Sequence, residues 1–236
     1  MVLRVSRKQS GDPEIFYSLQ GEGASIGIPT VFLRLATCNL NCSWCDTKYT
    51  WDWRHHDYET EVMSLQPEEI ERRVLDFKCN HLVITGGEPL IQQKALAPLT
   101  LSLKSRGFYC EVETNGTIPP SPTLRESISQ WNVSPKLSNS GVSQGKRESH
   151  QALKSFANLD NSYFKFVISN PPDVDEVHNI IQQHNLPSSR VILMPEGTDP
   201  LMLQSRSAWL SKICIERGFR FSTRLHILLW GDERGR

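Results

Sequence analysis

Three cysteines lie close together in the segment CNLNCSWCD, which runs from Cys38 to Asp46. Their spacing, C-x3-C-x2-C, allows one short loop to present three thiolates to a single metal centre. A structural zinc site usually closes with a fourth Cys or His, whereas an iron–sulfur cluster held by three cysteines leaves one iron open to an outside ligand. The spacing therefore predicts a 4Fe-4S cluster bound by Cys38, Cys42 and Cys45, within a cluster loop at residues 36–50.

Zinc is the alternative at this stage, because His55 and His56 follow the loop and either could complete a four-ligand site. In that case the chain would be a zinc-binding interaction module without catalysis. The other cysteines, Cys79, Cys110 and Cys214, are scattered among apolar neighbours. A disulfide framework is therefore not indicated, and each is predicted to be a small buried side chain.

Four polar motifs follow the cysteines along the chain: TGGEP at 85–89, ETNGT at 113–117, SPK at 134–136 and MPEG at 194–197. The two glycines of TGGEP allow a ligand to approach the backbone closely, and Glu88 can accept hydrogen bonds from an ammonium group. SPK and MPEG offer polar side chains and backbone groups that could hold a ribose and an adenine. Each string alone is also compatible with an ordinary turn. The prediction of a ligand site therefore rests on their order along the chain after the cysteine loop.

The cysteine loop, with Trp44 just before its last cysteine, resembles the signature of the radical S-adenosylmethionine (SAM) superfamily. In that superfamily the open iron chelates the amino and carboxylate groups of SAM, and an electron from the cluster cleaves the sulfonium to give a 5'-deoxyadenosyl radical. The resemblance implies that TGGEP contacts the amino group of SAM, with Glu88 taking part. Burial of the cluster would shield the radical from solvent and oxidants.

The stretch ahead of the cysteines carries an amide, a carboxylate and a guanidinium, at Gln20, Glu22 and Arg34. An amide and a carboxylate suit the edge of a pterin or guanine-like heterocycle, and Arg can bind a substrate carboxylate through two hydrogen bonds. On composition alone, the stretch could equally be a surface loop with a Gly-rich turn.

Nearly the whole chain resembles the 7-carboxy-7-deazaguanine synthase family of radical SAM enzymes. The resemblance lies in SLQGEG, the CDT after the last cysteine, TGGEP, ETNGT, VSPK and a late RLHILLWGDERG. It implies a carbon–nitrogen lyase of queuosine and deazapurine biosynthesis, which converts 6-carboxy-5,6,7,8-tetrahydropterin to 7-carboxy-7-deazaguanine with ring contraction and loss of ammonia. It also implies a homodimer, and SAM that is regenerated in each turnover.

Transferred position by position, the resemblance implies three sets of binding residues. The substrate would contact Leu19, Gln20, Gly21, Arg34 and Thr85, together with the carboxylate of Glu22. SAM would contact Trp44, Cys45, Asp46, Gly87, Glu88, Ser134, Pro135, Lys136, Met194, Pro195, Glu196 and Gly197. Thr47, the Thr of CDT, would bind a magnesium ion that also touches the substrate, in line with the preference of Mg²⁺ for oxygen ligands.

Two features vary within the family. Some members carry a long insertion between the first two cysteines, whereas this chain keeps the short spacing, so an ordinary cluster is expected. Family chains can also reach the substrate with their C-terminus, but Gly235 and Arg236 give no clear match and no contact is assigned to them. The alternative within the superfamily is a glycyl-radical-enzyme activase or another enzyme that acts on a protein, against which SLQGEG and CDT argue.

Short β-branched runs alternate with longer amphipathic stretches, which is typical of parallel α/β units. The predicted strands are Thr30–Leu35, His81–Thr85, Tyr109–Glu113, Trp131–Ser134, Tyr163–Ile168 and Arg190–Met194. The predicted helices are Pro67–Lys78, Gln92–Arg106 and Asp173–His184. About six such units are fewer than the eight of a closed barrel, so we expect an α/β fold, an incomplete, laterally open parallel (β/α)6-type barrel of the radical SAM superfamily. The polar motifs follow strand ends, where parallel α/β folds bind ligands.

The 236 residues are expected to form a single radical SAM domain, residues 1–236, because α/β domains of this size are common. Lys plus Arg and Asp plus Glu both number 26, so the net charge does not indicate nucleic acid or an anionic membrane as a partner. A small-molecule substrate and an electron donor such as flavodoxin or ferredoxin are expected instead. The sequence shows no apolar core of a signal peptide and no membrane-length apolar stretch, so a cytoplasmic location is expected.

Overall fold

The computed structural model describes residues 1–235, and these build one ten-stranded sheet with the order β10-β9-β8-β7-β6-β5-β3-β1-β4, in which β2 pairs with β3 beside this path. Six neighbouring strands are parallel to one another. They are β3 (Pro29–Leu35), β5 (His81–Gly86), β6 (Tyr109–Thr114), β7 (Gln130–Val133), β8 (Ser162–Ile168) and β9 (Val191–Pro195). All six predicted strands are therefore confirmed, to within one or two residues at either end.

Three antiparallel strands, which the sequence pattern did not predict, extend the sheet on the β3 side. β2 (Ile15–Leu19) pairs with β3 along its whole length, while β1 (Leu3–Ser6) pairs with the end of β3 and with β4 (Val62–Leu65). At the other edge, the two-residue β10 (Arg220–Phe221) continues the parallel order beside β9. Within residues 1–235 no strand pairing joins β10 to β4, so the expected laterally open barrel is confirmed.

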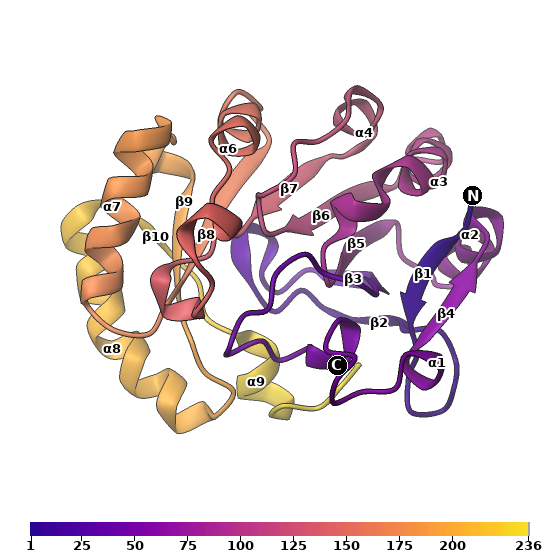
Figure 1. The fold of residues 1–236 in the computed structure, drawn as a ribbon, viewed down its shortest axis with the longest axis horizontal. Helices are drawn as coiled ribbons and strands as arrows, with labels where there is room; N and C mark the ends of the chain where they lie inside the picture. Colours follow the sequence, from indigo (N-terminus) through magenta and orange to yellow (C-terminus); the bar gives the residue numbers. More distant parts are fainter. Residues whose placement is uncertain (236) are drawn as a thin grey trace.

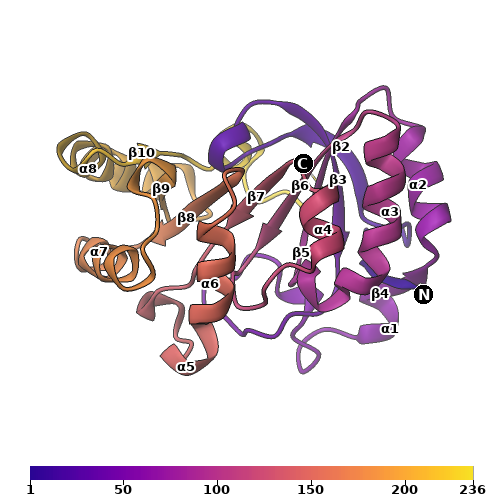
Figure 2. The same cartoon turned by 90° about the horizontal axis from the view of Figure 1, so that it is seen from above.

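The larger helices cover one face of the curved sheet. Figure 1 shows α2, α3, α4, α6, α7 and α8 along an outer arc, and Figure 2 shows the same arc from above. The loop after β3 and the C-terminal α9 lie on the opposite, concave side (Figure 1). The helices are α1 (Tyr58–Glu61), α2 (Pro67–Leu75), α3 (Gln93–Ser105), α4 (Pro122–Ser127), α5 (Gln144–Arg147), α6 (His150–Ala157), α7 (Pro172–His184), α8 (Pro200–Arg217) and α9 (Leu225–Trp230).

Alternation along the strands separates an apolar outer face from a polar inner face, because successive side chains of a strand point to opposite sides. The outward residues join the helices in the main core, for example Leu33, Ile84, Val112, Trp131 and Phe164. The inward residues line a cavity on the concave side, among them Arg34, Thr85, Glu113, Asn132 and Lys165. The outer face thus holds the fold together, while the inner face carries the polar side chains.

Local sequence signals explain several helix boundaries. α8 begins with Pro200 behind Asp199, whose side chain accepts a hydrogen bond from the Met202 amide 2.9 Å away, and it ends at Gly218, which has a left-handed backbone. Of the helices expected from the sequence, α2 ends at Leu75, earlier than predicted, and α3 begins at Gln93 because Pro89–Gln92 form a separate 3-10 turn.

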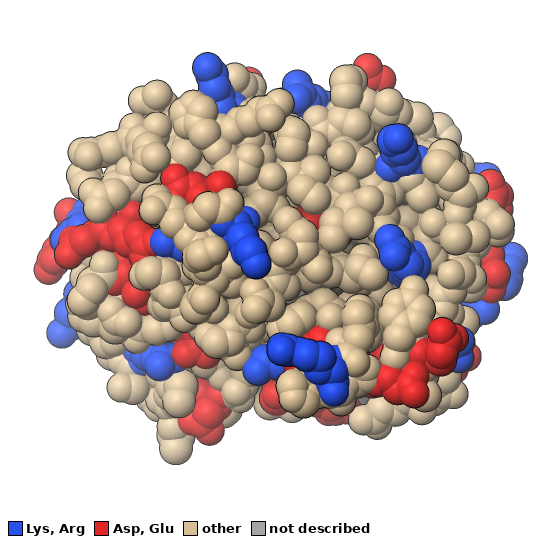
Figure 3. All heavy atoms as spheres, viewed as in Figure 1, with Lys and Arg blue, Asp and Glu red and all other residues tan. Residues whose placement is uncertain are grey.

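Charged residues of both signs lie on the face shown in Figure 3. The face in Figure 3 carries basic and acidic side chains in mixed positions, with uncharged surface between them. Within residues 1–235, no helix is long and apolar enough to span a lipid bilayer.

Candidate active site

One cavity, open to solvent on one side, lies at the carboxyl ends of the parallel strands. It is lined by most of the residues that the sequence analysis selected: Leu19, Gln20, Gly21, Glu22, Arg34, Cys38, Cys42, Trp44, Cys45, Asp46, Thr47, Thr85, Gly87, Ser134, Lys136, Met194 and Glu196. Glu88, Pro135, Pro195 and Gly197 lie next to it without lining it.

The thiols of Cys38, Cys42 and Cys45 all line this cavity, beside a small apolar group formed by Leu40, Cys42 and Val142. Two N–H groups approach the sulfur atoms: the Leu40 amide is 3.4 Å from Cys38 Sγ, and Trp51 Nε1 is 3.3 Å from Cys45 Sγ. Soft thiol donors with N–H neighbours are the environment in which iron–sulfur clusters are held. The residues present therefore fit a cluster on these three cysteines.

Burial shapes the chemistry of these thiols. Loss of solvent raises the pKa of Cys38 to about 12 and raises the pKa of Cys42 as well. The free thiols of Cys38 and Cys42 are therefore protonated at neutral pH, and binding of a metal cluster must displace their protons. No group of three His, Cys, Asp or Glu side chains in residues 1–235 is arranged to hold a single metal ion. His55 and His56, the possible zinc ligands, contact Asp52 and Glu61 and do not line the cavity.

The TGGEP turn at the end of β5 packs against the start of the cluster loop and is hydrogen-bonded to it. A Cβ atom on Gly86, which has a φ of +121°, would lie 2.0 Å from the carbonyl oxygen of Leu35, and one on Gly87 would lie 2.0 Å from that of Thr37. The Gly87 amide donates to Leu35 at 3.0 Å, and the Glu88 amide donates to Thr37 at 2.8 Å. The glycines are thus required by the close approach of two backbones, and not only by a ligand as the sequence suggested.

Glu88 lies behind this turn, fully buried, instead of facing the cavity. Its carboxylate accepts hydrogen bonds from Thr114 Oγ1 at 2.8 Å, from the Asn115 amide at 2.7 Å and from the Leu90 amide at 3.0 Å. Burial raises its pKa even though these donors favour the charged form. The geometry therefore gives Glu88 the role of fixing the ETNGT loop from behind the cavity wall.

The ETNGT loop is in turn bonded to the cluster loop. Asn115 Nδ2 donates to Asn39 Oδ1 at 2.9 Å, and Asn39 Nδ2 donates to Thr117 Oγ1 at 2.8 Å. Thr117 completes the group by donating to Asn115 Oδ1 at 2.6 Å. The three motifs therefore form one connected scaffold around the cysteines.

The half of the cavity near β2 presents groups that suit a polar heterocycle. Glu113 accepts a hydrogen bond from Gln20 Nε2 at 3.1 Å and another from Thr85 Oγ1 at 2.7 Å. Arg34 donates through Nε to the buried Glu14 at 2.8 Å, which holds its guanidinium at the cavity wall. Tyr49 donates to the same carboxylate at 3.0 Å. Amide and guanidinium groups thus line one wall at the predicted Gln20 and Arg34, but the carboxylate between them is Glu113 and not the predicted Glu22.

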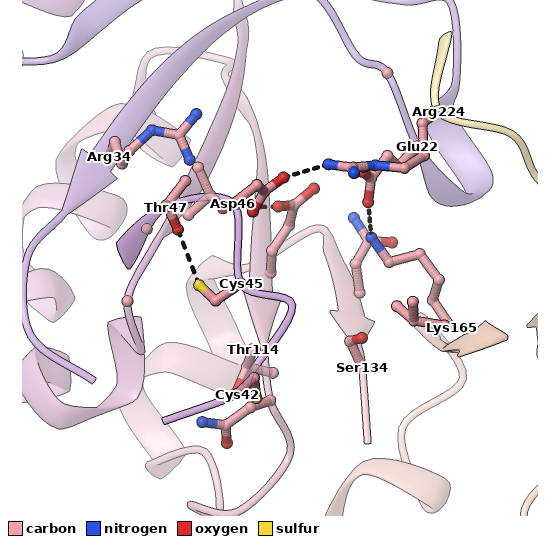
Figure 4. A pocket seen from close by; sticks show the side chains of 18 of the residues that line it. Glu22, Arg34, Cys42, Cys45, Asp46, Thr47, Thr114, Ser134, Lys165 and Arg224 are labelled. Carbon is pink, nitrogen blue, oxygen red and sulfur yellow. Dashed lines mark hydrogen bonds and ion pairs between the residues drawn. The ribbon is translucent and has the colours of Figure 1, made fainter. Parts of the chain in front are cut away.

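A cluster of charged side chains lies beside this wall. Figure 4 shows Glu22 between Lys165 and Arg224, and Arg224 next to Asp46. Burial alone would raise the pKa of Glu22, but Lys165, Arg224 and His226 together lower it well below its ordinary value. Burial also opposes ionisation of Asp46, yet Arg224 lowers its pKa. The two carboxylates are therefore ionised at neutral pH, whereas burial lowers the pKa of His226 and favours its neutral form.

The SPK and CDT residues line the same cavity. Lys136 Nζ donates to Ser134 Oγ at 3.0 Å and lies 5.4 Å from the ring centre of Trp44. Thr47 Oγ1 lies 3.6 Å from Cys45 Sγ, so its hydroxyl is next to the cysteines (Figure 4). These side chains could contact a nucleoside and a hard cation, respectively.

Further residues line the cavity that the sequence did not predict as site residues, among them Glu113, Asn132, Lys165, Arg224 and His226. Glu113 lies in ETNGT, and Arg224 and His226 lie in RLHILLWGDERG, so the family motifs contain these positions but do not by themselves assign them a role. Lys165 could have been found as the one charged residue inside the apolar run YFKFVI. For Asn132, the sequence offers only the alternation of polar and apolar residues in QWNV, which does not indicate a binding role.

Comparisons with known proteins point to one family. Residues 34–131 match the family model described as the Radical SAM superfamily. A 7-carboxy-7-deazaguanine synthase from Pyrobaculum aerophilum is 40% identical over 225 residues, which cover 94% of this chain and 96% of the relative.

The chain belongs to the 7-carboxy-7-deazaguanine synthase family.

Solved structures support the same assignment. The crystal structure of QueE from Escherichia coli superposes with a TM-score of 0.72 at 27% identity, covering 96% of this chain and 95% of that one. Streptococcus suis SuiB bound to its precursor peptide SuiA, at 14% identity and a TM-score of 0.56, shares the fold alone; this chain covers 48% of it. Membership of the 7-carboxy-7-deazaguanine synthase family confirms the expected radical SAM chemistry, with a 4Fe-4S cluster and SAM as cofactors.

Proposed function

We propose that the protein converts 6-carboxy-5,6,7,8-tetrahydropterin to 7-carboxy-7-deazaguanine with loss of ammonia. The observation that carries this proposal is the meeting, in one cavity, of the three cluster-loop thiols with the Gln20, Glu113 and Arg34 wall. An enzyme that only generated a radical for a protein partner would have no need of a wall of groups suited to a carboxylated heterocycle.

The substrate is positioned by the wall near β2. Gln20 and Thr85 hold Glu113 through one hydrogen bond to each carboxylate oxygen, and each oxygen can accept a second hydrogen bond from an N–H group of a pterin ring. Arg34 has its Nε occupied by Glu14, so its remaining N–H groups are the natural partners of the substrate carboxylate. Together these contacts define both ends of the substrate.

SAM occupies the half of the cavity near the cysteines in this proposal. When bound, the cluster and SAM supply a 5'-deoxyadenosyl radical that starts the rearrangement. The chain contributes Ser134, Lys136 and the Trp44 ring on one side and the Gly87 backbone on the other. Since the two halves form one cavity, the radical would arise beside the substrate and away from bulk solvent.

Thr47 is proposed to bind a magnesium ion between the two ligands. Its hydroxyl lies beside Cys45 and lines the same cavity as Arg34 and Asp46. A hard cation there would orient the substrate carboxylate and stabilise charge that develops during ring contraction.

The cellular setting follows from the family resemblance. We propose one cytoplasmic domain that assembles as a homodimer and receives electrons from a flavodoxin or ferredoxin. Light scattering tests the dimer, which should have twice the chain mass of 26.9 kDa.

Anaerobic reconstitution tests the proposed reaction. The protein is loaded with iron and sulfide, reduced, and incubated with SAM and the tetrahydropterin in the absence of any protein substrate. Mass spectrometry should detect a product that is lighter than the substrate by one ammonia. A reduced, cluster-loaded enzyme that cleaves SAM but leaves the pterin unchanged would contradict the proposal and favour the activase alternative.

A further inference from the structure

Arg224 connects three functional segments with a single guanidinium. Its Nε donates to Glu22 Oε1 at 2.9 Å, its Nη1 donates to the carbonyl oxygen of Gly197 at 2.8 Å, and its Nη2 donates to Asp46. The side chain is 9% exposed, and it lies in the segment between β10 and α9. Figure 4 shows it entering the site from this C-terminal segment.

The three partners come from parts of the chain that are far apart in sequence. Glu22 follows β2 beside the substrate wall, Asp46 follows Cys45 in the cluster loop, and Gly197 ends the MPEG turn. We propose that Arg224 is a positioning residue that fixes the substrate loop, the cluster loop and the SAM turn relative to one another. This inference rests on the proposed function for the identity of the two ligands.

Backbone contacts hold Arg224 in place from both sides. The Leu225 amide donates to the carbonyl oxygen of Gly21 at 2.8 Å, and the Gly23 amide donates to Ser222 Oγ at 2.9 Å. A Cβ atom on Gly21 would lie 2.1 Å from Nδ1 of His226, so this loop and the C-terminal segment are in direct contact. The segment at 222–226 is therefore attached to the substrate loop independently of the ion pairs.

Charge and shape both require Arg at this position. Burial would lower the pKa of Arg224, but Glu22 and Asp46 raise it above its ordinary value, so the group is charged. A planar guanidinium can serve three acceptors that lie in different directions at once, whereas the single ammonium of a lysine is a compact point charge. A lysine side chain here would keep the charge and still leave at least one of the three segments unbonded.

The experiment compares Arg224→Lys with Arg217→Lys as a matched control. Arg217 lies at the end of α8, where its side chain is 45% exposed and pairs with the exposed Asp175 at 3.4 Å. Exposed ion pairs of this kind contribute little to the stability of the fold. In steady-state kinetics, Arg224→Lys should raise the apparent KM for both SAM and the tetrahydropterin by about tenfold or more, and Arg217→Lys should change neither.

Hydrogen exchange measured by mass spectrometry provides a readout that does not need activity. In the reconstituted protein, Arg224→Lys should accelerate exchange in three separate segments, 20–23, 45–48 and 195–198, while Arg217→Lys should not. Asp46→Asn is the second variant: it should loosen 45–48 and leave 20–23 unchanged, because the contact between Arg224 and Glu22 persists.

The outcomes separate this inference from the proposed function. Faster exchange confined to peptides within 219–230 would overturn the positioning role, as would a lower melting temperature with both KM values unchanged. If the wild type made no deazaguanine product, the proposed function would fail, yet the exchange pattern would still decide whether Arg224 fixes the three segments.

Discussion

Cys38, Cys42 and Cys45 carry the proposed chemistry, and all three thiols face the same cavity. We predict that replacement of any one by Ala abolishes the visible 4Fe-4S absorbance and turnover, because each thiolate is a ligand and no spare thiol lines the cavity among residues 1–235. Iron and sulfide analysis together with the absorbance spectrum would measure the loss.

The other three cysteines provide matched controls for this test. Cys110 and Cys214 are buried in the main core, and Cys79 packs against it. Their replacement by Ala should leave cluster content and activity largely intact. A full cluster in Cys42→Ala would show that the ligands are assigned wrongly.

Arg34 is predicted to act on the substrate and not on SAM. Arg34→Lys keeps the charge but loses the two-donor fork, whose charged hydrogen bonds contribute about 1.5–3 kcal/mol, or roughly 10- to 100-fold in affinity. The KM for the tetrahydropterin should therefore rise far more than the KM for SAM. Equal changes in both constants would place Arg34 outside the substrate site and would resemble the effect expected for Arg224→Lys.

The turnover rate is predicted to depend on a magnesium ion that is bound by Thr47. Its hydroxyl lies 3.6 Å from Cys45 Sγ at the cavity wall, so Thr47→Ala should weaken the response of the rate to Mg²⁺ at saturating SAM. Magnesium titrations of the wild type and the variant, at matched cluster content, measure this response. A wild-type rate that is indifferent to chelation of magnesium, or identical titration curves, would rule out the metal assignment.

At the level of elements, the TGGEP turn determines how closely β5 approaches the start of the cluster loop. Gly87→Ala would place a methyl group 2.0 Å from the carbonyl oxygen of Thr37, where a backbone must move. We predict a melting temperature several degrees lower and a smaller fraction of protein that takes up iron. Gly145→Ala is the control, because a Cβ atom there has no neighbour within 4 Å. Equal behaviour of the two variants would show that the close approach has no role in the stability of the loop.

The sequence could predict the parallel strands because their outer faces are β-branched or aromatic and their ends carry polar motifs. It did not reveal β1, β2 and β4, since each is four or five residues long and depends on pairing with distant segments. IFYSL, for example, becomes a strand through its pairing with β3. Short strands of this kind are determined by tertiary contacts more than by their own residues.

The candidate site shows the same limit. Single motifs identified the cysteines and most of the cavity wall, because each motif carries its chemistry within a few residues. Arg224 could not be assigned a partner in this way, since its contacts with Glu22 and Asp46 span 202 and 178 positions of the chain. Glu88 also has contacts that its motif alone did not reveal, because its buried carboxylate accepts hydrogen bonds from Thr114 and Asn115 of the next strand end.

For the whole molecule, the buried charges should make the thermal stability depend on pH. The pKa of Glu22 is lowered from 4.5 because the positive charges of Lys165, Arg224 and His226 outweigh the effect of burial. The ionised Glu22 therefore contributes its full stabilisation of the folded state above about pH 4.5. This stabilisation is lost as the pH falls through the lower pKa that Glu22 has in the folded state. Glu22→Gln should accordingly lower the melting temperature most near neutral pH. Thermal scans should show the difference from wild type shrinking below pH 4.5, and a difference that grows in acid would contradict the lowered pKa.

The central claim is that one cavity holds the cluster, SAM and a carboxylated pterin side by side. A crystal structure of the anaerobically reconstituted protein with SAM and the tetrahydropterin tests it most directly. The account predicts a cluster on Cys38, Cys42 and Cys45, and the pterin against Gln20, Glu113 and Arg34. A cluster closed by a fourth protein ligand, or a pterin bound outside this cavity, would contradict it.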